Sequence, residues 1–143
     1  MKRLLIALAV CLVLSPVAEA GKVTFTTASW TSTDKVQTSQ ADPDSGIVTC
    51  SYMFEGTTFA SAYVRAGMTI SLRVVVGKDT EQLYHKDMER TINQNVQYSR
   101  PKFDVIGPTG TEWVLAWTVE RLNGKKQRLH IVDAIEAASG TCQ

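Results

Sequence analysis

Two cysteines, Cys50 and Cys142, constrain the fold of this chain more than any other feature, because they lie far apart and are expected to pair. The chain begins with an export signal, and thiols in an oxidising compartment tend to form disulfides. A bond between them would close a loop of about 93 residues. In the chain-entropy model such a loop stabilises the fold by roughly 4 to 5 kcal/mol. The bond would also pin a carboxyl-terminal tail that would otherwise fray.

The first 20 residues have the composition of a secretory signal peptide. Lys2 and Arg3 precede an apolar run over residues 4–14, and Ala18 and Ala20 occupy the small-residue positions of an Ala-x-Ala cleavage site. No other stretch approaches the roughly 20 apolar residues of a transmembrane helix. We expect cleavage after about Ala20 and a periplasmic or secreted mature protein. The absence of an Asn-x-Ser/Thr sequon is compatible with a bacterial origin.

The mature chain, residues 21–143, is long enough for one domain with a single hydrophobic core and too short for two. It carries 13 basic and 13 acidic residues, so its net charge is about zero. Nucleic acids and anionic membranes select a clustered positive field. The balanced charge therefore argues against either of them as the partner.

Alternation of apolar and polar residues predicts several strands. Residues 22–28 (KVTFTTA) alternate, and residues 47–54 (IVTCSYMF) place Cys50 on the more apolar of two faces. The clearest strand face belongs to residues 68–76 (MTISLRVVV). Residues 47–54, 59–66 (FASAYVRA) and 68–76 together predict an antiparallel meander, and residues 102–106 (KFDVI) predict a later short strand.

The hydrophobic period changes after Lys78. Asp79 is a candidate N-cap, and the helix should end before Pro101. Four large apolar residues recur at helical spacing: Tyr84, Met88, Ile92 and Val96. The expected fold class is therefore α+β, with a single domain built on a twisted antiparallel sheet of about six to seven strands. One amphipathic helix over about residues 79–97 packs on that sheet, and one disulfide staples it.

Residues 113–135 (WVLAWTVERLNGKKQRLHIVDAI) read as two strands around a tight turn. Asn123 and Gly124 are the pair that tolerates a type I′ turn, and this turn would place Trp117 opposite His130. Both faces of the hairpin are apolar near its middle, which is typical of a central, covered position in a sheet. Trp113 and Trp117 are therefore expected to anchor the core.

Two surfaces are candidates for binding. Residues 29–45 are polar and form a long expected loop, in which Trp30 is the residue most able to hold a partner. Basic residues gather at the tip of the predicted hairpin, where they could contact an acidic partner. The candidate binding residues are Trp30, Trp117, Arg121, Lys125, Lys126, Arg128 and His130.

Catalytic and metal-binding patterns are weak, and we predict no catalytic residue, no metal and no cofactor. His130 could act as a general base, but strand alternation sends Asp133 to the opposite face. No G-x-S-x-G occurs, and both mature cysteines are expected to be paired. Residues 41–46 (ADPDSG) resemble the start of a calcium loop, but Met53 stands where the bidentate Glu is needed, so they predict a turn.

These features favour a small exported, non-enzymatic binding or accessory module. Its partner would be an envelope or secretion-system protein, or an enzyme that it inhibits. One alternative is a small hydrolase or isomerase that uses His130 or His85 as a base, in a pocket between sheet and helix. Another is a carrier of lipid or other hydrophobic cargo. The sequence leaves the oligomeric state open.

Overall fold

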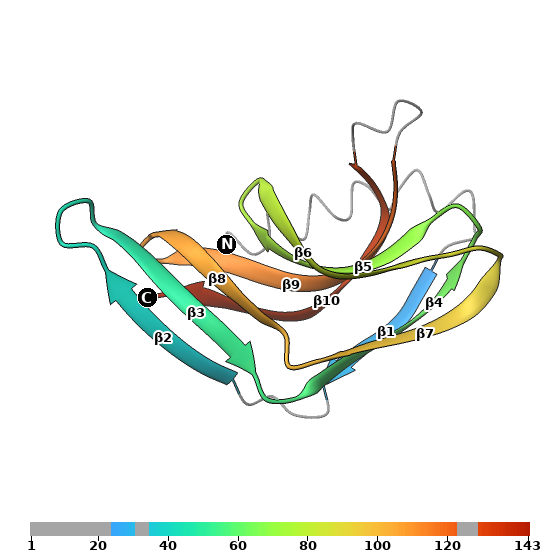
Figure 1. Cartoon of the computed structure of the whole chain (residues 1–143), viewed down its shortest axis with the longest axis horizontal. Coiled ribbons are helices and arrows are strands. Elements are labelled where there is room, and N and C mark those ends of the chain that lie inside the picture. Colours follow the sequence, from blue (N-terminus) through green and yellow to red (C-terminus); the bar gives the residue numbers. More distant parts are fainter. Residues whose placement is uncertain (1–23, 31–34, 123–128) are drawn as a thin grey trace.

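The computed structural model describes the backbone of residues 24–30, 35–122 and 129–143, and the side chains from residue 36 onward within those ranges. All ten regular elements in these ranges are β-strands (Figure 1). The predicted α+β class and its helix over residues 79–97 are therefore wrong. In the described part of the chain no helix could cross a membrane.

The strands form three antiparallel sheets, with the orders β1-β4-β7, β2-β3-β8 and β10-β9-β5-β6. In chain order they are β1 (Thr24–Trp30), β2 (Lys35–Ala41), β3 (Ile47–Phe54), β4 (Thr57–Val64), β5 (Thr69–Val76), β6 (Asp79–Asp87), β7 (Ile92–Ser99), β8 (Lys102–Pro108), β9 (Thr111–Leu122) and β10 (Leu129–Cys142).

The two three-stranded sheets follow one another as a single curved layer, which Figure 1 shows below the four-stranded sheet. Only Glu55 and Gly56 separate β3 from β4, and only Arg100 and Pro101 separate β7 from β8. The two interruptions lie side by side, because the Arg100 N–H donates to the Gly56 carbonyl at 2.8 Å and the Phe54 N–H donates to the Pro101 carbonyl at 3.0 Å. The layer therefore bends at one level across both strands.

Counting β1 with β2, β3 with β4 and β7 with β8 as one strand each, the two layers form a β-sandwich whose strand order resembles the immunoglobulin arrangement. The first layer joins the first, second and fifth strands, and the second layer joins the third, fourth, sixth and seventh. In the immunoglobulin constant arrangement the fourth strand pairs with the fifth. Here β6 pairs with β5 instead. The predicted meander is wrong at this point, because β4 pairs with β1 and β7 and not with β5.

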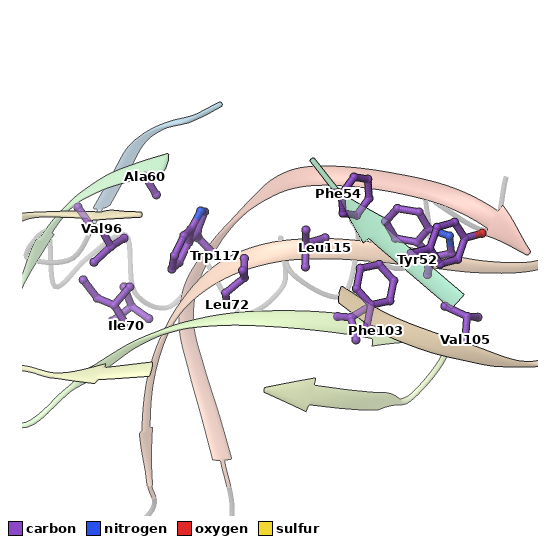
Figure 2. Close-up of a cluster of buried hydrophobic side chains, with 14 of the residues drawn as sticks. Tyr52, Phe54, Ala60, Ile70, Leu72, Val96, Phe103, Val105, Leu115 and Trp117 are labelled. Atoms are coloured by element: carbon purple, nitrogen blue, oxygen red, sulfur yellow. The ribbon is translucent and has the colours of Figure 1, made fainter. Parts of the chain in front are cut away.

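The core fills the space between the layers, and its two halves are visible in Figure 2. Aromatic rings dominate one half, where the Tyr52 ring lies 5.3 Å from Phe103 and 4.8 Å from Trp113. In the other half Trp117 is fully buried and its indole N–H donates to the Thr58 hydroxyl at 3.1 Å. Both tryptophans anchor the core, as predicted.

Alternation predicted the inward faces of β3 and β5 correctly. On β3 the buried side chains are Val48, Cys50, Tyr52 and Phe54, and on β5 they include Ile70, Leu72 and Val74. Burial in this cluster also raises the pKa of the Tyr52 hydroxyl, against a smaller lowering by its hydrogen bond with Trp113.

The helix prediction failed because a spacing of four residues satisfies two periods. Met88, Ile92 and Val96 are four apart, and residues four apart also share one face of a strand. In the structure Tyr84 lies on β6, whereas Ile92 and Val96 lie on β7 beyond a turn. The β5 strand pairs with β6 with one register shift, and this tertiary pairing overrides the local helical pattern.

The predicted loop over residues 29–45 is also wrong for most of its length. Trp30 ends β1, and β2 occupies Lys35–Ala41 and pairs with β3 along its whole length. Every described side chain of β2 is exposed, on both faces of the strand. No alternation therefore appears in its sequence, because neither face is buried.

The final hairpin exists, but its predicted register is wrong. Leu122 pairs with Leu129, His130 with Arg121, and Trp117 with Ile135. Two register shifts, between Ile131 and Asp133 and between Glu136 and Ala138, displace the pairing further. The Asn123–Gly124 turn lies outside the described residues.

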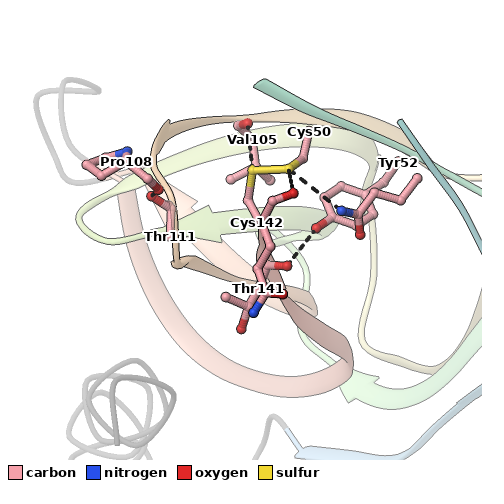
Figure 3. The surroundings of a disulfide bond; sticks show 9 residues. Cys50, Tyr52, Val105, Pro108, Thr111, Thr141 and Cys142 are labelled. Atoms are coloured by element: carbon pink, nitrogen blue, oxygen red, sulfur yellow. Dashed lines mark hydrogen bonds between the residues drawn. A yellow bond between two sulfur atoms is a disulfide. The ribbon is translucent and has the colours of Figure 1, made fainter. Parts of the chain in front are cut away.

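The Cys50–Cys142 disulfide is confirmed (Figure 3). It joins β3 in one layer to the end of β10 in the other, with Cα atoms 5.7 Å apart. Beside it the Tyr52 hydroxyl donates to the Thr141 carbonyl at 3.2 Å. Gly140 allows this close packing, because a Cβ there would lie 2.7 Å from the Trp113 ring. The carboxyl-terminal end is thus fixed to the core, as the pairing predicted.

Candidate functional site

The site that the geometry favours is the side of the sheet β2-β3-β8 that faces away from the core. Since Cys50 and Tyr52 point inward, the alternate residues of β3 point outward, and the strand register brings their neighbours on β2 and β8 to the same side. We call this surface the outer face. Its members are Val36, Thr38 and Gln40 of β2, Ile47, Thr49, Ser51 and Met53 of β3, and Lys102, Asp104, Ile106 and Pro108 of β8.

Exposed apolar side chains concentrate on the outer face. Seven large hydrophobic residues are exposed in the described part of the chain, and four of them belong to it. These four are Val36 at 44%, Ile47 at 36%, Met53 at 40% and Ile106 at 64% exposure. Single exposed apolar residues are ordinary, whereas a group of them on one face marks an interaction surface.

The cross-strand register arranges the outer face in rows. Val36 lies beside Met53, and Met53 beside Lys102. Ile47 lies beside Pro108 at the other end, with Ile106 on the same side of β8. The rows between these apolar ends are formed by Thr38, Ser51 and Asp104, and by Gln40, Thr49 and Ile106. The face therefore has two apolar ends joined by hydroxyl and amide groups.

Two open hollows lie along the outer face. The first, of about 540 Å³, is lined by Val36, Thr38, Ser51, Met53, Lys102 and Asp104, by the inward-facing Tyr52 and Phe103, and by Glu81 of β6. The second, of about 490 Å³, is lined by Gln40, Ile47 and Thr49 together with the turn after β2. Both hollows include residues of β2. A partner could thus seat side chains at either end of the face.

The turn between β2 and β3 closes one end of the outer face. The Asp42 carboxylate accepts a hydrogen bond from the Asp44 N–H at 2.9 Å, and the Gly46 N–H donates to the Asp42 carbonyl at 3.0 Å. Hydrogen bonds from Asp44 and Ser45 hold the pKa of Asp42 below its ordinary value. Gly46 adopts φ 74°, which glycine tolerates without strain. The predicted turn at residues 41–46 is confirmed.

Among the predicted site residues that the structure describes, only Arg121 and His130 lie side by side. Trp30 ends β1 and pairs through its backbone with Thr58, in the sheet β1-β4-β7 and not in the sheet of the outer face. Trp117 is buried. Arg121 and His130 face each other, exposed, near the end of the hairpin. Lys125, Lys126 and Arg128 lie outside the described residues, so the basic tip stays a prediction.

The predicted enzyme pocket lay between a sheet and a helix, and the described residues form no helix to line it. Neither His85 nor His130 lines either hollow of the outer face. Within the described ranges no three His, Cys, Asp or Glu side chains are grouped so that they could hold a metal ion.

Sequence reasoning missed the outer face, although one signal was present. The outward set of β3 begins with Ile47 and ends with Met53, which is unusual for a strand face turned to water. The contribution of Ile106 depends on the register between β3 and β8, and that of Val36 on the existence of β2. Neither could be obtained from local pattern alone.

No protein-family model, curated protein or solved structure matches this chain.

Proposed function

We propose that this protein is an exported, non-enzymatic module that binds a protein partner through its outer face. The observation that carries the proposal is the grouping of Val36, Ile47, Met53 and Ile106, all exposed, on one side of the sheet β2-β3-β8. Large exposed apolar groups of this kind, mixed with polar neighbours, mark protein interaction sites.

The chemistry of the face supports a protein as the partner. Its polar members are hydroxyl and amide groups, which can pair with backbone or side chains of a polypeptide. Its charges, Lys102 and Asp104, are of opposite sign and lie two residues apart on β8. This balance supports neither nucleic acid nor an anionic membrane, which select clustered positive charge.

The disulfide supports export as the setting of this function. Disulfides persist in the periplasm and outside the cell, whereas reducing systems keep cytosolic thiols free. The signal peptide inferred from residues 1–20 is the route to that compartment. The partner is therefore sought among envelope or secreted proteins.

Capture from an envelope extract tests the proposal. Immobilised mature protein is compared with Met53→Lys and Ile106→Lys variants and with a Tyr63→Lys control, in which a residue of β4 about as exposed as Met53 is changed. Loss of an anchor side chain and burial of a charge should weaken binding of the captured protein by about tenfold or more.

The matched control decides the interpretation. We expect Tyr63→Lys to bind as the unchanged protein does, since residue 63 lies on a different sheet. The proposal fails if the unchanged protein captures nothing. It also fails if the two outer-face variants retain the partner as well as Tyr63→Lys does.

A further inference from the structure

The edge strands of the described sheets differ in how well they are protected from pairing. An edge strand presents unpaired N–H and C=O groups, and proteins commonly guard them with bulges or charged residues. The pairing of β1, β6 and β10 with their neighbours is interrupted by register shifts. In addition β6 carries Asp79, Glu81, Lys86 and Asp87, and β8 carries Lys102 and Asp104.

β2 has none of these protections beyond its first residue. Its register with β3 runs without a shift from Lys35 to Ala41, and residues 36–41 are uncharged. Both of its faces are exposed, so no side chain of the other layer covers it. β7 is also regular and uncharged, but its alternate residues, such as Val96, are turned into the sandwich. β2 is therefore the most accessible regular edge in the described ranges.

We infer that β2 pairs antiparallel with β2 of a second copy of the chain, about a two-fold axis at Thr38. This register uses all seven residues of the strand. It joins two sheets of order β2-β3-β8 into one six-stranded sheet with the two outer faces on the same side. An isologous two-fold contact is closed, so it yields a dimer and no fibre.

The side chains opposed by this register are compatible. Thr38 lies opposite Thr38 of the second copy, and hydroxyl pairs of this kind stabilise antiparallel strands. Val36 lies opposite Gln40, Gln37 opposite Ser39, and Lys35 opposite Ala41. No two like charges are opposed along the strand. Shifting the axis to Ser39 would set Val36 against Asp42, which leaves an apolar side chain against a carboxylate.

The dimer would have a low association constant, but it would bring two outer faces together. One strand pair buries less than the roughly 1,200 Å² of a typical stable interface, so the dimer should dissociate on dilution. It would place two outer faces in one continuous surface. A partner with two copies of its epitope would then be held with the added strength of simultaneous contacts.

Cysteine cross-linking tests the register directly. In mature Thr38→Cys the two introduced Cβ atoms would lie about 5 Å apart across the axis, which suits a disulfide. In Gln40→Cys, on the same strand and face, they would lie about 14 Å apart and cannot bond. After mild oxidation we expect a several-fold stronger dimer band for Thr38→Cys, with peptide mapping to confirm that Cys50–Cys142 is intact.

Sedimentation velocity tests the dimer without a cross-link. The unchanged mature protein should show concentration-dependent dimers, and Thr38→Lys should abolish them by opposing two positive charges at the axis. Gln97→Lys, the same change on the exposed side of β7, should leave them unaffected. The inference is overturned by a monomer at every concentration, by equal cross-linking of the two cysteine variants, or by dimers that survive Thr38→Lys. These measurements involve no partner, so they stand apart from the test of the proposed function.

Discussion

At the scale of single residues, the feature least expected in a small sandwich is a buried ion pair on the four-stranded sheet. Glu120 of β9 is 2% exposed and pairs with Arg73 of β5. Its carboxylate also accepts hydrogen bonds from Ser71, at 3.1 Å, and from Thr118. Buried charges are tolerated when they are paired and hydrogen-bonded in this way. The network therefore connects the two central strands through their side chains.

Glu120→Ala should be among the most destabilising single changes in the protein. It leaves the Arg73 guanidinium, whose side chain is 12% exposed, without its partner. Breaking a buried pair from one side costs about 3 to 5 kcal/mol of unfolding free energy. Urea unfolding measures the loss, with Glu136→Ala, an exposed carboxylate on β10, as the control. A Glu120→Ala protein as stable as the control would show that the pair contributes little.

At the scale of elements, the bend between the two three-stranded sheets depends on one unusual backbone. Arg100 adopts φ 51°, a left-handed conformation that few residues other than glycine adopt easily. Its N–H is nevertheless bonded to Gly56, so the hydrogen bond holds the strained residue in place. Pro101 follows, and β8 begins at the next residue, Lys102. Arg100 is therefore the strained residue at this bend, beside the interruption at Glu55 and Gly56 in the neighbouring strand.

Arg100→Gly should stabilise the protein by roughly 0.5 to 1 kcal/mol, because glycine removes the side-chain clash at positive φ. The gain is limited by the greater freedom of glycine in the unfolded chain. Urea midpoints measure it. Gln97→Gly, placed in regular β7, should instead destabilise the protein. If Arg100→Gly were as destabilising as Gln97→Gly, the strain at this bend would be negligible.

The same elements show how far sequence reasoning reaches. β3 and β5 were predictable because each buries one face, which leaves a clear alternation. The strand β2 was not predictable, because neither of its faces is buried and its sequence therefore shows no alternation. β6 and β7 were not, because the spacing of Met88, Ile92 and Val96 fits a helix face and a strand face equally. The outer face was missed for the same reasons, since β2 has no local pattern and β8 joins the face only through its long-range pairing with β3.

At the scale of the whole molecule, the Cys50–Cys142 disulfide connects the two layers at the aromatic half of the core. In the described chain, side chains between the layers hold the sandwich together, because no strand of one layer pairs with a strand of the other. The disulfide adds a covalent link between β3 of one layer and β10 of the other. It also keeps the last strand, β10, aligned against Trp113.

Replacing both cysteines by alanine should lower the unfolding free energy by roughly 4 to 5 kcal/mol, as expected for a loop closed over 92 positions. Urea unfolding of the double variant against the oxidised protein measures the loss. Hydrogen exchange should accelerate most in the last residues of β10, which lose their anchor. Unchanged exchange there would mean that packing alone fixes the carboxyl-terminal end.

The placement of this bond also governs how the protein would respond to tension between its two ends. A pull on the carboxyl-terminal end passes from Cys142 directly to Cys50, so the 92-residue span between them carries no load. That span, roughly 300 Å if fully extended, cannot lengthen while the bond is intact. Only the segment before Cys50, with β1, β2 and the start of β3, could be drawn out. Seven of the ten strands, β4 to β10, lie within the closed loop and would add no length to the stretched chain.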